Sequence, residues 1–286
     1  MTDEVWNTER LHDHFAQSLR VSEMYYDSKT EHQRLKVFQN GTFGRVLTLD
    51  DVVQTTEGDN FIYHEMLTHV PVLAHGNASD ICIIGGGDGG ILREALKHPV
   101  DRVTMVEIDP SVIALCRQHL PSISAGAFDD PRADVVIADG ARFIAETDLR
   151  FDVIIVDSTD PMGPGEVLFT SEFYGACKAR LTDGGVIVTQ SGVAMIQGGE
   201  LTTTVRRLGK HFADANAYIA PIPTYVGGFM ALGWGTDNTA LRDLSPGQLA
   251  KRFHEADITT RYYNADLHGG AFALPTYIAN LVEAAR

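Results

Sequence analysis

Residues 81–90 read ICIIGGGDGG, a short apolar run that leads straight into a glycine-rich loop, and residues 91–98, ILREALKH, continue with the pattern of a helix. Further apolar runs, each followed by a helical pattern or by a loop leading to one, are VTMVEID (103–109), VVIAD (135–139), FDVIIVD (151–157) and GGVIVTQ (184–190). Strands that alternate with helices are typical of parallel sheets covered on both faces. The sequence therefore predicts an α/β fold built on a doubly wound sheet.

The residues that precede this stretch follow a different pattern. Between residues 19 and 56, short runs rich in β-branched and aromatic residues read as strands, and Asn40-Gly41 between two of them is a strong hairpin signal. These runs predict a small antiparallel sheet. We therefore expect an N-terminal β-strand domain over residues 1–61 and a second domain, built on the doubly wound sheet, over residues 62–286.

Local signals predict further elements around the alternating core. Asp59 is a candidate N-cap for a helix over residues 61–70 that ends before Pro71. Residues 218–223 and 229–236 are expected to form a closing pair of strands, and the C-terminal residues read as helices with a loop between them.

The composition narrows the class of partner. The chain has 38 acidic and 23 basic residues, for a net charge of -15. This charge disfavours nucleic acid and anionic membranes and suits a cationic small molecule, although it could serve solubility alone.

No apolar run approaches the roughly 20 residues that span a bilayer, and the start MTDEVWNTERLHDHF is too polar for a secretory signal, so we expect a cytoplasmic protein. The scattered Cys82, Cys116 and Cys177 predict reduced thiols.

An acidic side chain stands at the end of each of the first four predicted strands of the doubly wound sheet. Asp88 lies in the loop after the first strand, and Glu107, Asp139 and Asp157 follow the next three. In open α/β sheets, ligands bind beyond the carboxyl ends of the strands. We therefore expect these carboxylates to surround one ligand site. Because they are spread over four strand ends, they suit an elongated cation better than a metal ion, and no metal is expected.

The glycine loop indicates a nucleoside without specifying which one. Gly85, Gly87 and Gly90 have the spacing G-x-G-x-x-G, and Glu107 follows about 20 residues later, where it can accept hydrogen bonds from a ribose. Asp88 inside the loop would repel a pyrophosphate, which disfavours NAD. A nucleoside that carries a positive sulfonium meets no such repulsion, so the sequence favours an S-adenosyl compound.

Several of these residues also have a purely structural interpretation. Asp88 could cap the helix that opens after it. Asp139 could cap the next helix, or it could bind the adenine edge together with the backbone of Gly140. Asp160 could belong only to a turn. Asp157 is harder to explain in this way, because it ends a fully apolar strand.

The chain from Trp6 to about Thr236 closely resembles the bacterial spermidine synthases, a family of aminopropyltransferases. The motifs that carry the resemblance are GRVLTLDDVVQTTEGDNFIYHE (44–65), IIGGGDGG (83–90), MVEID (105–109), ADG (138–140), VDSTDPMGP (156–164) and PTYVGG (223–228). The run DSTDPMGPGEVLF is far more specific than the glycine loop. The resemblance implies a methyltransferase-like Rossmann domain behind an N-terminal β domain, and a homodimer or homotetramer.

The resemblance also implies roles for individual residues. The donor co-substrate, decarboxylated S-adenosylmethionine, would contact Gln33, Asp88, Glu107, Asp139, Gly140 and Pro164, with Asp88 on its aminopropyl ammonium. The acceptor putrescine would lie in a groove formed by Tyr63, His64, Asp88, Asp157, Asp160 and Tyr225. Asp157 would be the general base, and no cofactor beyond the donor would be needed.

The implied reaction yields spermidine and 5'-methylthioadenosine. It needs a neutral amine, whereas alkylammonium groups titrate near a pKa of about 10, so a base must accept a proton. Other readings stay open: an acceptor such as cadaverine, agmatine or spermidine, a putrescine N-methyltransferase, a dehydrogenase, or a catalytically silent polyamine-binding protein. The sequence sets neither the acceptor's length nor the number of subunits, nor whether the loop after Asp160 closes over the site.

Overall fold

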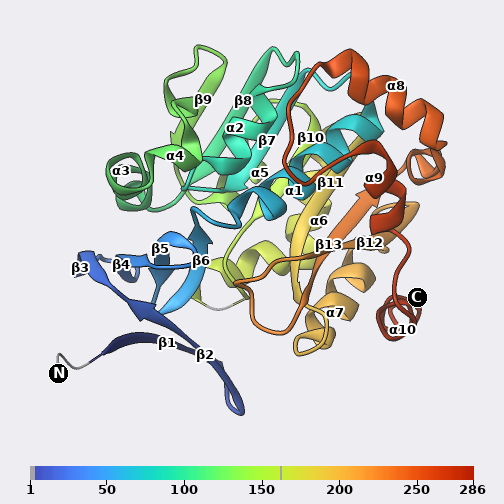
Figure 1. Ribbon diagram of the computed structural model, residues 1–286. Helices are drawn as coiled ribbons and strands as arrows, with labels where there is room; N and C mark the ends of the chain where they lie inside the picture. The colour runs from blue at the N-terminus through green and yellow to red at the C-terminus, as the bar shows by residue number, and fades with distance from the viewer. Residues whose placement is uncertain (1–3, 162) are drawn as a thin grey trace.

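A seven-stranded sheet forms the centre of the molecule, which the computed structural model describes for residues 4–161 and 163–286 (Figure 1). In spatial order its strands are β12 (Asp214–Pro221), β13 (Phe229–Thr236), β11 (Leu181–Val193), β10 (Phe151–Asp157), β7 (Asp80–Gly85), β8 (Arg102–Glu107) and β9 (Ala133–Ile137). Pairing is parallel from β11 through β9, and β13 is antiparallel to both β11 and β12. The predicted doubly wound sheet and its closing pair are confirmed.

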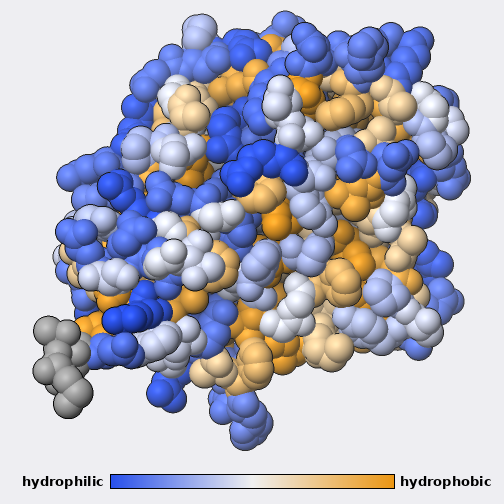
Figure 2. All heavy atoms as spheres, viewed as in Figure 1, coloured by the Kyte–Doolittle hydropathy of each residue, from blue (hydrophilic) through white to orange (hydrophobic). Residues whose placement is uncertain are grey.

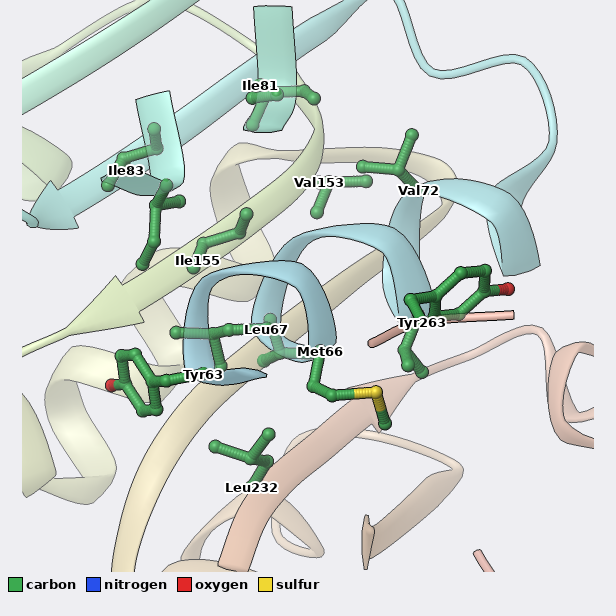
Figure 3. Packing of buried hydrophobic residues seen from close by; sticks show 14 of the residues in the cluster. Tyr63, Met66, Leu67, Val72, Ile81, Ile83, Val153, Ile155, Leu232 and Tyr263 are labelled. Carbon is green, nitrogen blue, oxygen red and sulfur yellow. The ribbon is translucent and has the colours of Figure 1, made fainter. Parts of the chain in front are cut away.

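Helices cover both faces of this sheet, because neighbouring strand residues point to opposite sides. Ile81 and Ile83 pack with α1 and α2, whereas Cys82 and Ile84 pack with α5 and α6. Figure 3 shows the first face, where Ile83 and Ile155 lie near Leu67 of α1. The helices are α1 (Asn60–His75), α2 (Gly90–Leu96), α3 (Pro110–His119), α4 (Pro121–Ser124), α5 (Gly140–Glu146), α6 (Ser171–Arg180), α7 (Gly198–Leu208), α8 (Pro246–Ala256), α9 (Ala265–Ala271) and α10 (Thr276–Glu283), with 3-10 turns η1 (Ala127–Asp129), η2 (Gly163–Phe169) and η3 (Thr239–Asp243).

The N-terminal residues form two antiparallel sheets where one was predicted. The four-stranded sheet contains β3 (Glu23–Lys29), β4 (Arg34–Asn40), β5 (Gly44–Leu49) and β6 (Val52–Thr56), and the separate two-stranded sheet contains β1 (Val5–His12) and β2 (Phe15–Val21). The predicted hairpin at Asn40 is confirmed: its Oδ1 atom accepts hydrogen bonds from the N–H groups of Thr42 and Phe43. The first hairpin was missed because β1 is mostly polar and its strands are largely exposed.

Helix α1 does not end before Pro71, as the sequence suggested, but continues to His75 and closes on the left-handed Gly76. Pro71 removes one helical hydrogen bond, which costs roughly 3 kcal/mol in a helix interior. Burial offsets this cost, because Met66, Leu67 and Val70 on the same helix are fully buried in the core. Tertiary packing therefore overrides the local stop signal.

Glu65 of α1 anchors the C-terminal part of the chain. Its buried carboxylate accepts hydrogen bonds of 2.8 Å from the backbone N–H groups of Arg261, Tyr262 and Tyr263. We expect Glu65→Ala to lower the free energy of unfolding by about 3 kcal/mol, because hydrogen bonds to a charged acceptor are lost and buried donors stay unpaired. Urea unfolding would measure this loss. The exposed Glu255→Ala is the control and should change stability by less than about 0.5 kcal/mol; equal losses in both variants would contradict the anchoring role.

The exposed side chains are mostly hydrophilic, and the cysteines are unpaired, as the composition predicted. Hydrophilic side chains form most of the outline of the face in Figure 2, with hydrophobic ones scattered between them. Cys82, Cys116 and Cys177 are buried free thiols, and burial raises the pKa of each. Within residues 4–161 and 163–286, no helix is long and apolar enough to cross a membrane.

Candidate active site

A cavity lies at the carboxyl ends of β7, β8 and β10, where the strand order of the large sheet reverses. This is the position that open α/β sheets use for ligands, and the strand-end carboxylates were predicted to meet there. All four of them line the cavity: Asp88, Glu107, Asp139 and Asp157. The N-terminal sheets supply the opposite wall, so both parts of the chain contribute to one site.

The glycine loop after β7 is packed between the end of β10 and helix α1. Gly85 has a φ of +87°, and a Cβ atom there would lie 1.9 Å from the carbonyl oxygen of Asp157. A Cβ atom on Gly90 would lie 2.1 Å from the His64 ring. Glycine at these two positions therefore lets Asp157 and His64 approach the loop and face the cavity.

Asp157 ends β10 and is held by an aromatic pair. Its Oδ1 atom accepts a 2.7 Å hydrogen bond from the Tyr63 hydroxyl. The Tyr63 ring meets the Tyr225 ring edge-on at 5.7 Å between centroids, and the Tyr225 hydroxyl donates to the carbonyl of Gln54. Burial, and then the charge of Asp88, raise the pKa of Asp157 to about 6. Burial and the charge of Asp157 also raise the pKa of both tyrosines, which keeps their hydroxyls protonated.

Asp88 has two partners within the chain, a backbone N–H of α2 and His64, and the second was not predicted. The N-cap of α2 is Gly89, so Asp88 lies one residue before the cap position. Its Oδ1 atom accepts a 2.8 Å hydrogen bond from the N–H of Gly90 at the start of α2, as a capping residue does. Its Oδ2 atom lies 3.1 Å from Nε2 of His64. Burial would raise the pKa of Asp88, but the charge and hydrogen bond of His64 lower it below its usual range.

Glu107 and Asp139 lie farther along the same edge of the sheet. Glu107 accepts a 2.9 Å hydrogen bond from the N–H of Asp109, and burial raises its pKa to about 7. Asp139 caps α5, accepting from the N–H of Arg142 at 2.9 Å, and it also lines the cavity beside Gly140. The capping interpretation of Asp139 is therefore correct, and the cavity position leaves it available to a ligand.

Gln33 and Pro164 were also predicted to contact the donor. Gln33 lines the cavity, but from the turn between β3 and β4 and not from within a strand. Pro164 belongs to η2, and its side chain is outside the described part of the structure.

The other end of the cavity contains Asp160, which was predicted, together with residues that the sequence analysis missed. Asp160 accepts a 3.1 Å hydrogen bond from Nε2 of Gln197, which also donates to Glu200 at 3.2 Å. Glu9 of β1 lines the opposite wall and accepts hydrogen bonds from the N–H of Val53 and the amide of Gln17. Burial raises the pKa of Asp160, Glu9 and Glu200, in the last case to about 7.

Only some of these residues left a signal in the sequence. Gln190 ends the fifth apolar run, so the strand-end rule that found Asp157 would also have found it. Glu9 gave no such signal, because its burial depends on β1 folding back over β6. Gln197 and Glu200 belong to a turn and helix whose orientation follows from tertiary packing.

The charge of the cavity is strongly one-sided. Along its described lining, the acidic side chains are Glu9, Asp88, Glu107, Asp139, Asp157 and Asp160, and no lysine or arginine is found. Within the described chain, no group of three or more His, Cys, Asp or Glu residues is arranged to hold a metal ion. An elongated site with carboxylates along its length suits a ligand that carries several positive charges.

Comparisons with known proteins agree with this geometry. The family models described as "Spermidine synthase tetramerisation domain" and "Spermine/spermidine synthase domain" match residues 5–57 and 60–245. A polyamine aminopropyltransferase from Ruegeria sp. (strain TM1040) is 66% identical over 98% of this chain and 99% of its own, and one from Klebsiella pneumoniae (strain 342) is 54% identical over 98% of each. A crystal structure of spermidine synthase in complex with the transition state analogue AdoDATO has a TM-score of 0.92 at 36% identity, covering 98% of this chain and 95% of that one.

Proposed function

The chain belongs to the spermine/spermidine synthase family, and from this premise we propose that it transfers the aminopropyl group of its donor to putrescine, with Asp157 as the general base. It is an aminopropyltransferase, and decarboxylated S-adenosylmethionine is its co-substrate. One observation carries the proposal: the Asp157 carboxylate, fixed by Tyr63, lies between the nucleoside end and the acidic far end of a single cavity. We also propose that residues 1–61 and 62–286 are two units that meet at this cavity.

The donor occupies the end of the cavity built on β7, β8 and α5. Glu107 accepts hydrogen bonds from the ribose, and Asp139 with Gly140 recognises the adenine. Asp88 receives the ammonium of the aminopropyl group. Gln33, which lines the cavity, and Pro164 also contact the donor. The chemistry of these groups supports the assignment, because a sulfonium nucleoside with a terminal ammonium presents positive charge where the cavity presents carboxylates.

The acceptor lies against the adjoining rings of Tyr63 and Tyr225, which line the cavity together, and extends toward Asp160. The aromatic pair removes water from the amine that reacts, and the hydrogen bond from Tyr63 orients Asp157 toward it. His64 forms part of the same wall. The far ammonium of the acceptor remains charged and pairs with Asp160, which Gln197 holds in place.

The reaction is a direct displacement. Asp157 accepts a proton from the near ammonium of putrescine, and the freed amine nitrogen attacks the carbon beside the sulfonium. The new C–N bond forms as the C–S bond breaks, and the C–S electron pair stays on sulfur, so that methylthioadenosine leaves neutral. Ammonium groups titrate near a pKa of about 10, and the raised pKa of Asp157, about 6, narrows the gap that the proton must cross.

A competition assay tests the choice of acceptor. The purified protein is incubated with decarboxylated S-adenosylmethionine and equal amounts of putrescine, cadaverine, agmatine and spermidine, and products are identified by mass spectrometry. We expect spermidine and methylthioadenosine to dominate, because the distance from Asp157 to the far carboxylates sets one preferred length, and each methylene of mismatch costs roughly 1–3 kcal/mol. Intact S-adenosylmethionine, offered in parallel, controls for methyl transfer.

Each other outcome would change a different part of the proposal. If another aminopropylated amine were the main product, the proposed reaction would stand but the acceptor would not be putrescine. Methylated amines would overturn the donor. A protein that binds polyamines without forming product would overturn the assignment of catalysis.

The N-terminal sheets supply the surface that we propose for assembly into a homodimer or homotetramer. The matched family model is described as a tetramerisation domain and covers residues 5–57. Val5, Trp6 and Phe15 on β1 and β2 are at least half exposed, which is unusual for large apolar side chains unless another surface covers them.

A further inference from the structure

The carboxylate that we assign to the donor's ammonium already has a partner within the chain. Nε2 of His64 lies 3.1 Å from Oδ2 of Asp88, and their side chains are 3% and 10% exposed. A protonated His64 would be a cation at the place where the donor brings another cation. Two positive charges this close repel each other strongly in a buried site, so they compete for Asp88.

The position of the His64 ring is fixed by the packing around it. The ring stands against the backbone of Gly90, so closely that a Cβ atom there would lie 2.1 Å from Nδ1. Its other neighbour is the Tyr63 ring, at 5.9 Å between centroids in an edge-on contact. His64 therefore cannot move aside for the donor, and the competition has to be resolved by a change of charge.

The second ring nitrogen of His64 shows how that change occurs. Nδ1 is buried and has no hydrogen-bond partner among the described residues. A neutral ring that keeps its hydrogen on Nε2 leaves an unpaired acceptor at Nδ1, whereas an imidazolium buries there an unpaired N–H donor that also shares the positive charge, which costs more. Only the charges that face the ring favour the second proton.

The charged groups around the ring come from three elements. Asp88 faces it from the loop before α2 and Asp157 from the end of β10, and both favour the imidazolium; Arg93 of α2 opposes it. Burial lowers the pKa of His64, but the charge and hydrogen bond of Asp88 outweigh burial and raise it above the usual range. The proton on Nδ1 therefore depends mainly on Asp88 remaining an unneutralised anion.

We propose, resting on the function proposed above, that His64 is the resident counter-ion of Asp88 and releases one proton when the donor's ammonium binds. The imidazolium loses its Nδ1 proton to solvent and keeps its Nε2–H, which continues to donate to Oδ2 of Asp88. The ammonium then replaces the lost positive charge. His64 is a positioning residue: it holds Asp88 charged and oriented in the empty site and yields its charge to the correct ligand.

This proton release should make the binding of the donor depend on pH in a way that the binding of the nucleoside product does not. Methylthioadenosine has no ammonium, so its binding leaves the proton on His64. Below the pKa of His64, the donor's apparent Kd should increase with each unit that the pH falls, by a factor that approaches about ten. The reason is that donor binding then has to expel a proton. The Kd of methylthioadenosine should lack this component.

Calorimetric titration in buffers of different ionisation enthalpy counts the released protons directly. Donor and methylthioadenosine are each titrated into the wild type and into His64→Gln, near pH 6.5 and near pH 8.5. At the lower pH, we expect the donor to release close to one proton more than methylthioadenosine in the wild type. His64→Gln keeps a hydrogen-bond donor for Asp88 but has no proton to lose, so this difference should vanish. Subtracting methylthioadenosine removes the contributions of Glu107 and the adenine site.

The outcomes distinguish the two proposals. Equal proton release by donor and methylthioadenosine in the wild type would overturn the exchange. So would a difference that persists in His64→Gln, because the proton would then come from Asp157 or from the donor itself. If the variant fails to fold, the wild-type comparison of the two ligands across pH still decides. Failure of the wild type to aminopropylate putrescine near pH 8.5 would instead overturn the proposed function.

Discussion

Asp157→Asn is expected to lower kcat about a thousandfold while the protein remains folded, because a positioned general base contributes about that factor. Asparagine has nearly the same shape, and its oxygen can still accept the hydrogen bond that the Tyr63 hydroxyl now makes at 2.7 Å. It cannot take up a proton, so the attacking amine stays an ammonium. Steady-state rates of methylthioadenosine formation would measure the loss, with circular dichroism and donor affinity to verify the fold.

Asp160→Asn is the matched control for that experiment. Asp160 lies at the far end of the cavity, so its loss should raise the KM for putrescine much more than it lowers kcat. The pH profile gives a second check. Activity of the wild type should fall as the pH drops through about 6, because Asp157 then becomes protonated and cannot act as a base. Normal turnover by Asp157→Asn would show that another group accepts the proton.

Gly85→Ala is expected to lower the free energy of unfolding by more than about 4 kcal/mol, a loss typical of severe steric conflict. The new Cβ atom would lie 1.9 Å from the carbonyl oxygen of Asp157, in a backbone with a φ of +87°. Both partners are backbone atoms of buried neighbouring strands, so neither can move without breaking the pairing of β7 with β10. Thermal and urea unfolding would measure the change, and a fall in Tm of roughly 10 °C or more is expected.

Gly126→Ala is the control that measures the cost of the backbone conformation in the absence of a steric clash. Gly126 has the same φ of +87°, but apart from its chain neighbours no atom of the described residues lies within 4 Å of the Cβ position. Its replacement should cost only the conformational strain, about 1–2 kcal/mol. If the two variants lost equal stability, the close approach of the glycine loop to Asp157 would not be what requires glycine at residue 85.

The parts of the site that could be predicted from the sequence follow from one geometric rule. Parallel strands end at the same edge of a sheet, so acidic residues at the ends of apolar runs had to meet there. Asp88, Glu107, Asp139 and Asp157 all line the cavity for this reason. The roles of these residues stay predictions, because position in a cavity does not identify which ligand atom each one contacts.

The remaining features depend on contacts between distant segments, which local patterns do not contain. The continuation of α1 through Pro71 follows from burial against the sheet. Glu9 becomes a cavity residue only because β1 folds back over β6. The pairing of His64 with Asp88 joins a helix to a loop more than twenty residues away. In each case the residue can be read from the sequence, but the distant residue that it contacts cannot.

The order in which the cavity walls occur along the chain has a consequence for how the protein is made. Glu9 comes from β1, and Tyr225 lies far later in the chain, on the connection between β12 and β13. A nascent chain that has emerged only through β11 has the glycine loop and Asp157 but neither Tyr225 nor the strand that covers the edge of β11. Such a chain would expose that edge, and the part of α1 that β12 covers, until β12 and β13 have emerged, which makes it a natural client for chaperones.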